Sequence, residues 1–84
     1  MYDLGGTNML DQVREILSQY VEADPSTITE DTQLAEDLGL SSFAFMTMMG
    51  NFEETFGITV DETELTGIRT VGDVMDYVKK KQAE

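Results

Sequence analysis

The sequence predicts an all-α fold, a small bundle of three main helices plus one short helix. Three stretches repeat apolar residues at spacings of three and four, which is the period of an amphipathic helix. Proline, glycine and capping residues separate these stretches, so each predicts a helix of its own. No pair of alternating segments predicts two strands that could form a sheet.

The first helix is expected from about Asn8 to Val21. Thr7 or Asn8 can cap its start, because a short polar side chain accepts a hydrogen bond from the first helical turn. Asp24-Pro25 lies beyond its end, since the residue before a proline is pushed out of the helical region. The apolar face of this helix is formed by Leu10, Val13, Ile16, Leu17 and Tyr20.

A long connection follows, from Ser26 to Leu40. It exceeds the ordinary loop length, so we expect a short helical turn near Leu34 to Asp37. Ile28 and Leu34 are apolar residues among Thr, Glu and Asp, and should anchor the connection to the core. Long ordered loops tend to carry function.

The central helix is expected from Ser42 to Phe56, after a serine pair that suits a helix start and before Gly57, which suits a helix end. One broad face should enter the core, and its members are Phe45, Met48, Met49, Phe52 and Phe56. On the opposite side, Phe43, Met46 and Gly50 line up where polar residues normally face solvent. This second stripe predicts a surface for a partner.

The remaining chain completes the bundle. Ile58-Thr59-Val60 is too short for a sheet and should be a linker, and Asp61 to Leu65 should form the short helix. Thr70-Val71-Gly72-Asp73 is close to a capping box, and it opens a last helix from Val71 to about Lys80. The residues expected to face the core here are Leu65, Ile68, Val71, Val74, Met75 and Val78.

Size and charge narrow the possible functions. The 84 residues suit one domain, residues 1–84, with residues 1–6 forming a loose glycine-bearing lead. Seventeen acids and five bases give a net charge of −12, so we expect no nucleic-acid partner, because such binding requires a basic surface. An acidic field instead favours a basic protein partner, or serves only solubility.

Cysteine and histidine are both absent, which removes thiolate chemistry, disulfides and the commonest general base. We therefore expect no enzyme activity and no metal site. No apolar run approaches the roughly 18 residues that a membrane helix needs, and the N-terminus lacks the pattern of a signal peptide. The expectation is a cytoplasmic monomer that does not enter a membrane.

The run Glu36-Asp37-Leu38-Gly39-Leu40-Ser41-Ser42-Phe43 resembles the acyl carrier protein motif, usually written D-L-G-x-D-S-L. As in that family, a helix follows that ends Phe-Glu-Glu-x-Phe-Gly-Ile, here Phe52 to Ile58. Thr70 to Asp73 is similar to the family's Thr-Val-Gly-Asp at the last helix. The resemblance spans about Met9 to Lys81 and implies an acyl-carrier-like bundle.

This resemblance makes Ser42 the attachment point of 4′-phosphopantetheine, transferred from coenzyme A by a phosphopantetheinyl transferase. Acyl groups would then travel as thioesters among acyl-transferring and ketosynthase-type enzymes of fatty acid or polyketide biosynthesis. The missing cysteine fits, because the reactive thiol arrives with the prosthetic group. Two other functions stay open: an unmodified acidic helical module that binds a partner helix through Phe43 and Met46, and an aminoacyl or peptidyl carrier. For Ser42 itself, the alternative is that it merely caps the helix.

The chain departs from the family motif beside the serine. Ser41 stands where the family has aspartate, Phe43 stands where it has leucine, and the central helix carries no acid before Glu53. We therefore expect apolar contacts to matter more in docking than in typical acidic carriers, with charge steering from the flanks. The predicted partner-binding residues are Phe43, Met46, Gly50, Glu53, Glu54, Glu36 and Asp37.

Overall fold

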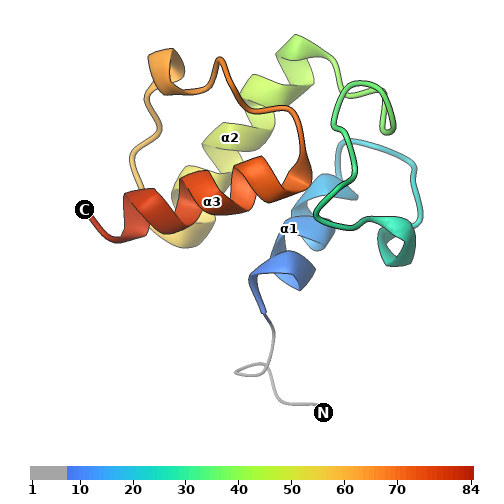
Figure 1. Cartoon of the computed structure of the whole chain (residues 1–84), viewed down its shortest axis with the longest axis horizontal. Coiled ribbons are helices and arrows are strands. Elements are labelled where there is room, and N and C mark those ends of the chain that lie inside the picture. Colours follow the sequence, from blue (N-terminus) through green and yellow to red (C-terminus); the bar gives the residue numbers. More distant parts are fainter. Residues whose placement is uncertain (1–7) are drawn as a thin grey trace.

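The computed structural model describes residues 8–84, and over this range the fold is all-α, as predicted (Figure 1). The predicted loose segment, residues 1–6, lies outside the described residues. Three α-helices and two single turns of 3₁₀ helix follow one another along the chain: α1 (Met9–Leu17), η2 (Pro25–Thr27), α2 (Ser42–Phe56), η3 (Glu62–Glu64) and α3 (Val71–Gln82). None of the helices described is long and apolar enough to cross a bilayer.

The three α-helices each contact the other two and enclose one apolar core. Most residues of the predicted inner faces are buried there, and those only partly buried are Leu10, Tyr20, Phe45, Phe56 and Ile68. Tyr77 is also buried, which the sequence reading missed. The fully buried large side chains are Phe52, Leu17, Ile28, Met48, Met49, Val13, Val71, Val74 and Val78.

Helix α1 begins as predicted but ends earlier. The Asn8 side chain accepts a hydrogen bond from the Asp11 N–H at 2.9 Å, which caps the first turn. The α-helix stops at Leu17, so the predicted end at Val21 is wrong. Beyond it, the Tyr20 N–H donates to the Leu17 carbonyl at 2.9 Å, a tighter i+3 bond that continues the apolar spacing without continuing the helix.

The long connection is anchored where the sequence predicted. Ile28 and Leu34 are both buried. The predicted helical turn is present as a hydrogen-bonded turn, in which the Asp37 N–H donates to the Gln33 carbonyl at 2.9 Å, although no regular helix forms. The Gln33 N–H in return donates to the Asp37 carboxylate at 2.8 Å, which closes the turn.

This connection pairs with the chain that leads into α3. The Leu34 N–H donates to the Arg69 carbonyl at 2.9 Å, and the Val71 N–H donates to the Thr32 carbonyl at 3.0 Å. Between them, Gln33 and Thr70 form an isolated antiparallel bridge rather than a strand. The pairing fixes the end of the connection against the residues that precede α3, and thereby positions the candidate site.

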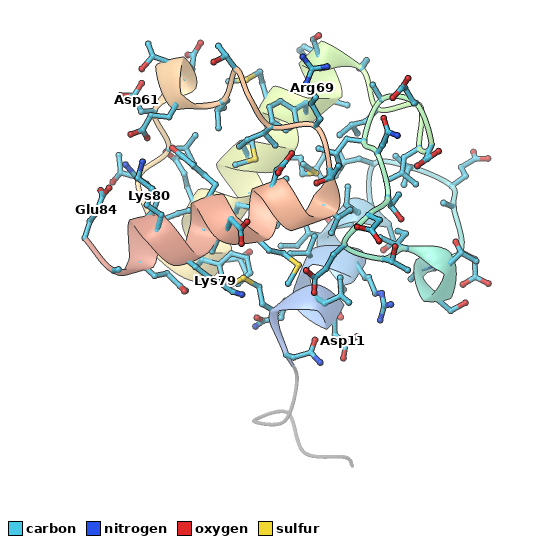
Figure 2. The ribbon with its side chains drawn as sticks, in the orientation of Figure 1. Asp11, Asp61, Arg69, Lys79, Lys80 and Glu84 are labelled. Atoms are coloured by element: carbon cyan, nitrogen blue, oxygen red, sulfur yellow. The ribbon has the colours of Figure 1, made fainter. Side chains whose placement is uncertain are left out.

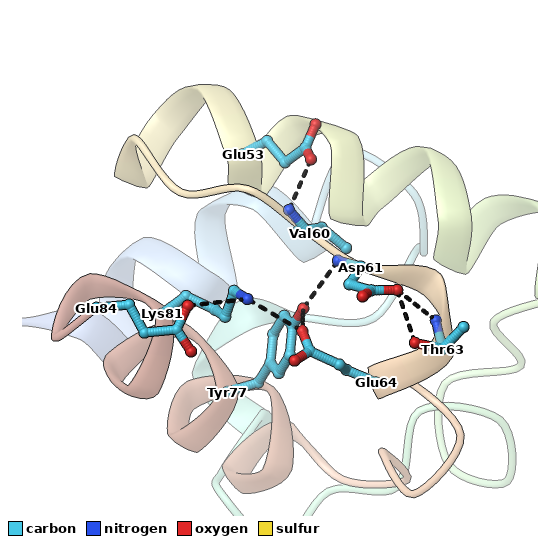
Figure 3. Close-up of polar contacts among 8 residues, drawn as sticks. All are labelled: Glu53, Val60, Asp61, Thr63, Glu64, Tyr77, Lys81 and Glu84. Carbon is cyan, nitrogen blue, oxygen red and sulfur yellow. Dashed lines mark hydrogen bonds and ion pairs between the residues drawn. The ribbon is translucent and has the colours of Figure 1, made fainter.

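The segment between α2 and α3 is held down by side chains (Figure 3). Gly57 has φ +66°, a left-handed conformation that ends α2 at the predicted residue. The Tyr77 hydroxyl accepts from the Asp61 N–H at 3.0 Å and donates to the Glu64 carboxylate at 2.7 Å. Lys81 Nζ lies 3.1 Å from the same carboxylate, so η3 is tied to the C-terminal half of α3.

Helix α3 carries the capping box that the sequence predicted. The Thr70 hydroxyl accepts from the Asp73 N–H at 3.1 Å, and the Asp73 carboxylate accepts from the Thr70 N–H at 3.1 Å. Hydrogen bonds from the Arg69 N–H and then the Thr70 N–H to the Asp73 carboxylate hold the pKa of that carboxyl below its ordinary value. The helix runs to Gln82, two residues past the predicted end at Lys80.

Candidate functional site

The two serines at the start of α2 have different roles. Ser41 is the N-cap, and its hydroxyl oxygen accepts from the Ala44 N–H at 3.1 Å. Ser42 is the first helical residue, is exposed, and has no hydrogen-bond partner for its hydroxyl among residues 8–84. The alternative in which Ser42 caps the helix is therefore wrong, and its hydroxyl is free to react.

The chain before Ser42 reaches the helix through a tight turn. Gly39 has φ +68°, which L side chains rarely adopt, so glycine suits this position. Leu40 then enters the core, and its N–H donates to the Leu34 carbonyl at 3.0 Å. A buried leucine thus stands two residues before Ser42, and it fixes where the exposed serine emerges.

Ser42 lies on the wall of a cavity of about 360 Å³. Three segments form this cavity: the turn in the long connection, the start of α2, and the chain between η3 and α3. The cavity therefore depends on the pairing described above, which brings the chain before α3 beside the turn in the long connection. Its lining residues are Gln33, Leu34, Ala35, Glu36, Leu40, Ser41, Ser42, Phe45, Leu65, Ile68 and Arg69.

The cavity has an apolar interior and charged edges. Phe45, predicted as a core residue, is only partly buried and forms part of its wall together with Leu65 and Ile68. Glu36 and Arg69 are its charged lining residues. The start of α2 contributes unpaired backbone N–H groups and the positive end of the helix dipole, with no acid in the first turn to offset them.

The second stripe of α2 faces outward, as predicted. Phe43 is 83% exposed, Met46 is 38% exposed, and Gly50 is also exposed. Met48 and Met49, in contrast, are fully buried. The facing assigned to the central helix is therefore confirmed, and it leaves a large aromatic side chain in solvent next to Ser42.

The acids that precede Ser42 lie in two different settings. Glu36 is exposed and lines the cavity with Ser42. Asp37 is also exposed, but its carboxylate accepts from the Gln33 N–H at 2.8 Å, so it stabilises the turn. Only Glu36 of this pair is brought to the cavity.

The acids at the far end of α2 differ in the same way. Glu54 is exposed, and its side chain makes no hydrogen bond or ion pair among residues 8–84. Glu53 is half-buried, and its carboxylate accepts from the Val60 N–H at 2.7 Å. Both lie at the opposite end of the helix from Ser42 and its cavity.

Sequence reasoning did not identify Arg69, Leu65, Ile68 or Phe45 as site residues. Leu65 and Ile68 carried an apolar signal that predicted only anchoring, and Phe45 carried one that predicted the core. Nothing in the sequence near Arg69 places it beside a serine in a distant segment. Among residues 8–84, no group of three or more acidic side chains is arranged to hold a metal ion.

Comparison with known proteins gives consistent matches. The family model described as a phosphopantetheine attachment site matches residues 11–78. The chain is 39% identical over 70 residues to an acyl carrier protein of Thermotoga maritima, covering 83% of this chain and 86% of that protein. It is 32% identical over 77 residues to an acyl carrier protein of Caulobacter vibrioides, covering 92% and 99%.

A more specialised relative is also similar. The meromycolate extension acyl carrier protein of Mycobacterium leprae is 31% identical over 72 residues, which cover 86% of this chain and 63% of that protein. Relatives of both kinds thus align with most of the described residues.

The prosthetic group that these matches indicate is 4′-phosphopantetheine. The site suits it, because the exposed Ser42 hydroxyl, which has no hydrogen-bond partner among residues 8–84, stands at a helix start on the wall of a cavity. The absence of cysteine agrees as well, since this group brings its own thiol. From its helical fold, the extent of the family match and the identity to its relatives, the chain belongs to the acyl carrier protein family.

Proposed function

We propose that this protein is a discrete acyl carrier that moves acyl groups between cytoplasmic enzymes of fatty acid or polyketide biosynthesis. The acyl groups are held as thioesters on 4′-phosphopantetheine attached to Ser42 Oγ. The observation that carries the proposal is the free, exposed Ser42 hydroxyl at the start of α2. The neighbouring Ser41 hydroxyl is less suitable for attachment, because it is already hydrogen-bonded to the Ala44 N–H.

Attachment forms one bond and breaks another. Ser42 Oγ bonds to the phosphorus of coenzyme A that bears the pantetheine. The bond from that phosphorus to the bridging oxygen of the diphosphate breaks, adenosine 3′,5′-bisphosphate leaves with that oxygen, and the serine proton is removed. The chain has no histidine, the commonest general base, and in this proposal the transferase takes the proton. The positive end of α2 favours the negative phosphodiester that results.

In this proposal the protein positions the reacting group and other enzymes catalyse. When bound, the prosthetic group supplies a thiol on which an acyl group is held as a thioester. The chain's own part is to hold Ser42 at a fixed helix start and to present a recognisable surface beside it. The expected partners are a phosphopantetheinyl transferase and acyl-transferring and ketosynthase-type enzymes.

Phe43 and Met46 are proposed to be the centre of that surface. They are exposed next to Ser42, and exposed aromatic and methionine side chains in a group commonly mark an interaction site. The acids Glu36 and Glu54 flank this stripe and would steer a basic partner toward it. Steering of this kind weakens as salt rises.

The proposal is tested by loading the protein in two steps. The protein is incubated with coenzyme A and a broad-specificity phosphopantetheinyl transferase, and then with an acyl donor and a matching acyl-transferring enzyme. We expect intact-mass spectra to show one phosphopantetheinyl group and then one acyl group, the latter removed by hydroxylamine. A protein that gains no mass with several transferases would contradict the carrier function and favour the unmodified interaction module.

A further inference from the structure

Arg69 is the basic residue on the cavity wall that Ser42 shares. Its backbone is fixed on both sides: the N–H donates to the Asp73 carboxylate at 3.0 Å, and the carbonyl accepts from the Leu34 N–H at 2.9 Å. Figure 2 shows its side chain at the N-terminal end of α2. A rigid backbone therefore presents this guanidinium to the region that Ser42 occupies.

The Arg69 guanidinium is not held by a direct contact within the described part of the chain, although its charge helps to lower the pKa of the Asp73 carboxyl. Among residues 8–84 it makes no hydrogen bond and no ion pair. Arg14, in contrast, donates to the Ile28 carbonyl at 2.8 Å and pairs with Asp11 at 3.0 Å. Lys81 is paired with Glu64 and with Glu84, each at 3.1 Å.

The other two bases lie elsewhere. Figure 2 shows Lys79 and Lys80 toward the C-terminal end of α3, well separated from Arg69. On a chain with a net charge of −12, Arg69 therefore places a positive charge, unpaired among residues 8–84, on the cavity wall that Ser42 shares. Glu36 on the same cavity wall would repel an anion brought there, and Arg69 would offset that repulsion.

We propose that Arg69 binds the phosphodiester formed on Ser42 and so directs the attached phosphopantetheine, here called the prosthetic arm, across the cavity. This inference rests on the proposed attachment at Ser42. A guanidinium suits the task, because its fork of N–H donors matches the two free oxygens of a phosphodiester, and such charge-assisted bonds are stronger than neutral ones. Arg69 is then a positioning residue, and the cavity is the space over which the arm lies.

The test compares the modified forms of wild type, Arg69→Gln, Arg69→Lys and Lys80→Gln. Lys80→Gln is the matched control, since it removes the same charge at a distant place. The readout is the ³¹P chemical shift of the phosphodiester, followed as salt is raised. We expect a salt-dependent shift in wild type and Lys80→Gln, loss of that dependence in Arg69→Gln, and partial recovery in Arg69→Lys.

Three results would overturn the proposal. One is a ³¹P shift and salt dependence that are the same in Arg69→Gln as in Lys80→Gln. Another is failure of Arg69→Gln alone to accept the arm, which would assign the guanidinium to the transferase. The third is an effect seen only with a malonyl load and not with acetyl or free thiol, which would assign Arg69 to a cargo carboxylate.

These results are distinct from failure of the proposed function. If wild type accepts no arm at Ser42, the carrier function itself is contradicted before any ³¹P measurement. If wild type accepts the arm there and only the ³¹P comparison fails, the carrier function stands and the role of Arg69 does not.

Discussion

The Glu53 carboxylate accepts a hydrogen bond from the Val60 N–H at 2.7 Å, which ties the last turns of α2 to the linker that leaves it (Figure 3). Its neighbour Glu54 is exposed and makes no such contact. The two adjacent acids were predicted alike as partner-binding residues. The structure gives one of them a role in folding and leaves the other free for solvent or a partner.

The first prediction separates these two acids. Glu53→Ala should lower the free energy of unfolding by about 1 kcal/mol, because it leaves the Val60 N–H without its acceptor. Glu54→Ala should change it by less than about 0.5 kcal/mol, as surface substitutions usually do. Urea unfolding of both variants checks this, and equal effects would show that the Glu53 contact is not significant.

The second prediction concerns acid stability. The Tyr77 hydroxyl, and after it Lys81, lower the pKa of the Glu64 carboxyl from its ordinary value of 4.5. A lowered pKa in the folded state contributes stability that is full above the ordinary value and is lost as pH falls through the folded value. Glu64→Gln should therefore melt below wild type at neutral pH, and the difference should shrink in acid.

Thermal melts of wild type and Glu64→Gln across acidic and neutral pH measure this difference. Glu62→Gln is the control, since Glu62 is exposed on the same turn and its side chain makes no hydrogen bond among residues 8–84. A gap between wild type and Glu64→Gln that stayed constant with pH would show that the carboxylate's charge is not involved.

The third prediction uses two glycines. A Cβ at Gly72 would lie 3.1 Å from the Glu30 carbonyl oxygen, which already accepts the Gly72 N–H at 2.8 Å. Gly72→Ala should therefore destabilise the fold by roughly 1–2 kcal/mol. Gly50→Ala meets nothing within 4 Å on an exposed helix surface and should stabilise it by up to about 1 kcal/mol. Denaturant unfolding should show opposite signs, and equal signs would contradict the argument.

The fourth prediction concerns the outward stripe of α2. Phe43→Ala and Met46→Ala should lower kcat/KM for acyl transfer to a cognate enzyme, because they remove exposed apolar contacts beside Ser42. Their melting temperatures should stay close to that of wild type. Met48→Ala is the contrast, since it opens a cavity in the core and should cost about 2–5 kcal/mol. Transfer rates unchanged by both stripe variants would refute docking there.

The parts of the fold that could be predicted are those set by residues close together in the sequence. The ends of α2 were predicted correctly, because Ser41 and Gly57 act on neighbouring backbone groups. The end of α1 was misplaced, because apolar spacing continues through Tyr20 although the hydrogen bonds there change to i+3. Tyr77 was not predicted in the core because tyrosine carries a polar hydroxyl. Its ring is apolar and can be buried here, since the hydroxyl forms hydrogen bonds with Asp61 and Glu64.

The candidate site was predictable only in part for the same reason. The motif around Ser42 is continuous in the sequence, so the serine could be singled out. The cavity beside it depends on the pairing of Leu34 with Arg69, residues far apart along the chain. No local pattern encodes that contact, and so Arg69 could not be placed at the site without the structure.

The most direct test of the central claim maps the site of modification in two matched variants. Ser41→Ala removes the N-cap of α2 and should cost about 1 kcal/mol of stability, yet it should still accept phosphopantetheine. Ser42→Ala removes a hydroxyl that has no hydrogen-bond partner in the described part of the chain, so it should fold as well as wild type and accept no phosphopantetheine. Fragmentation of modified wild-type peptides should place the added mass on Ser42; modification of Ser42→Ala at Ser41 would contradict the account.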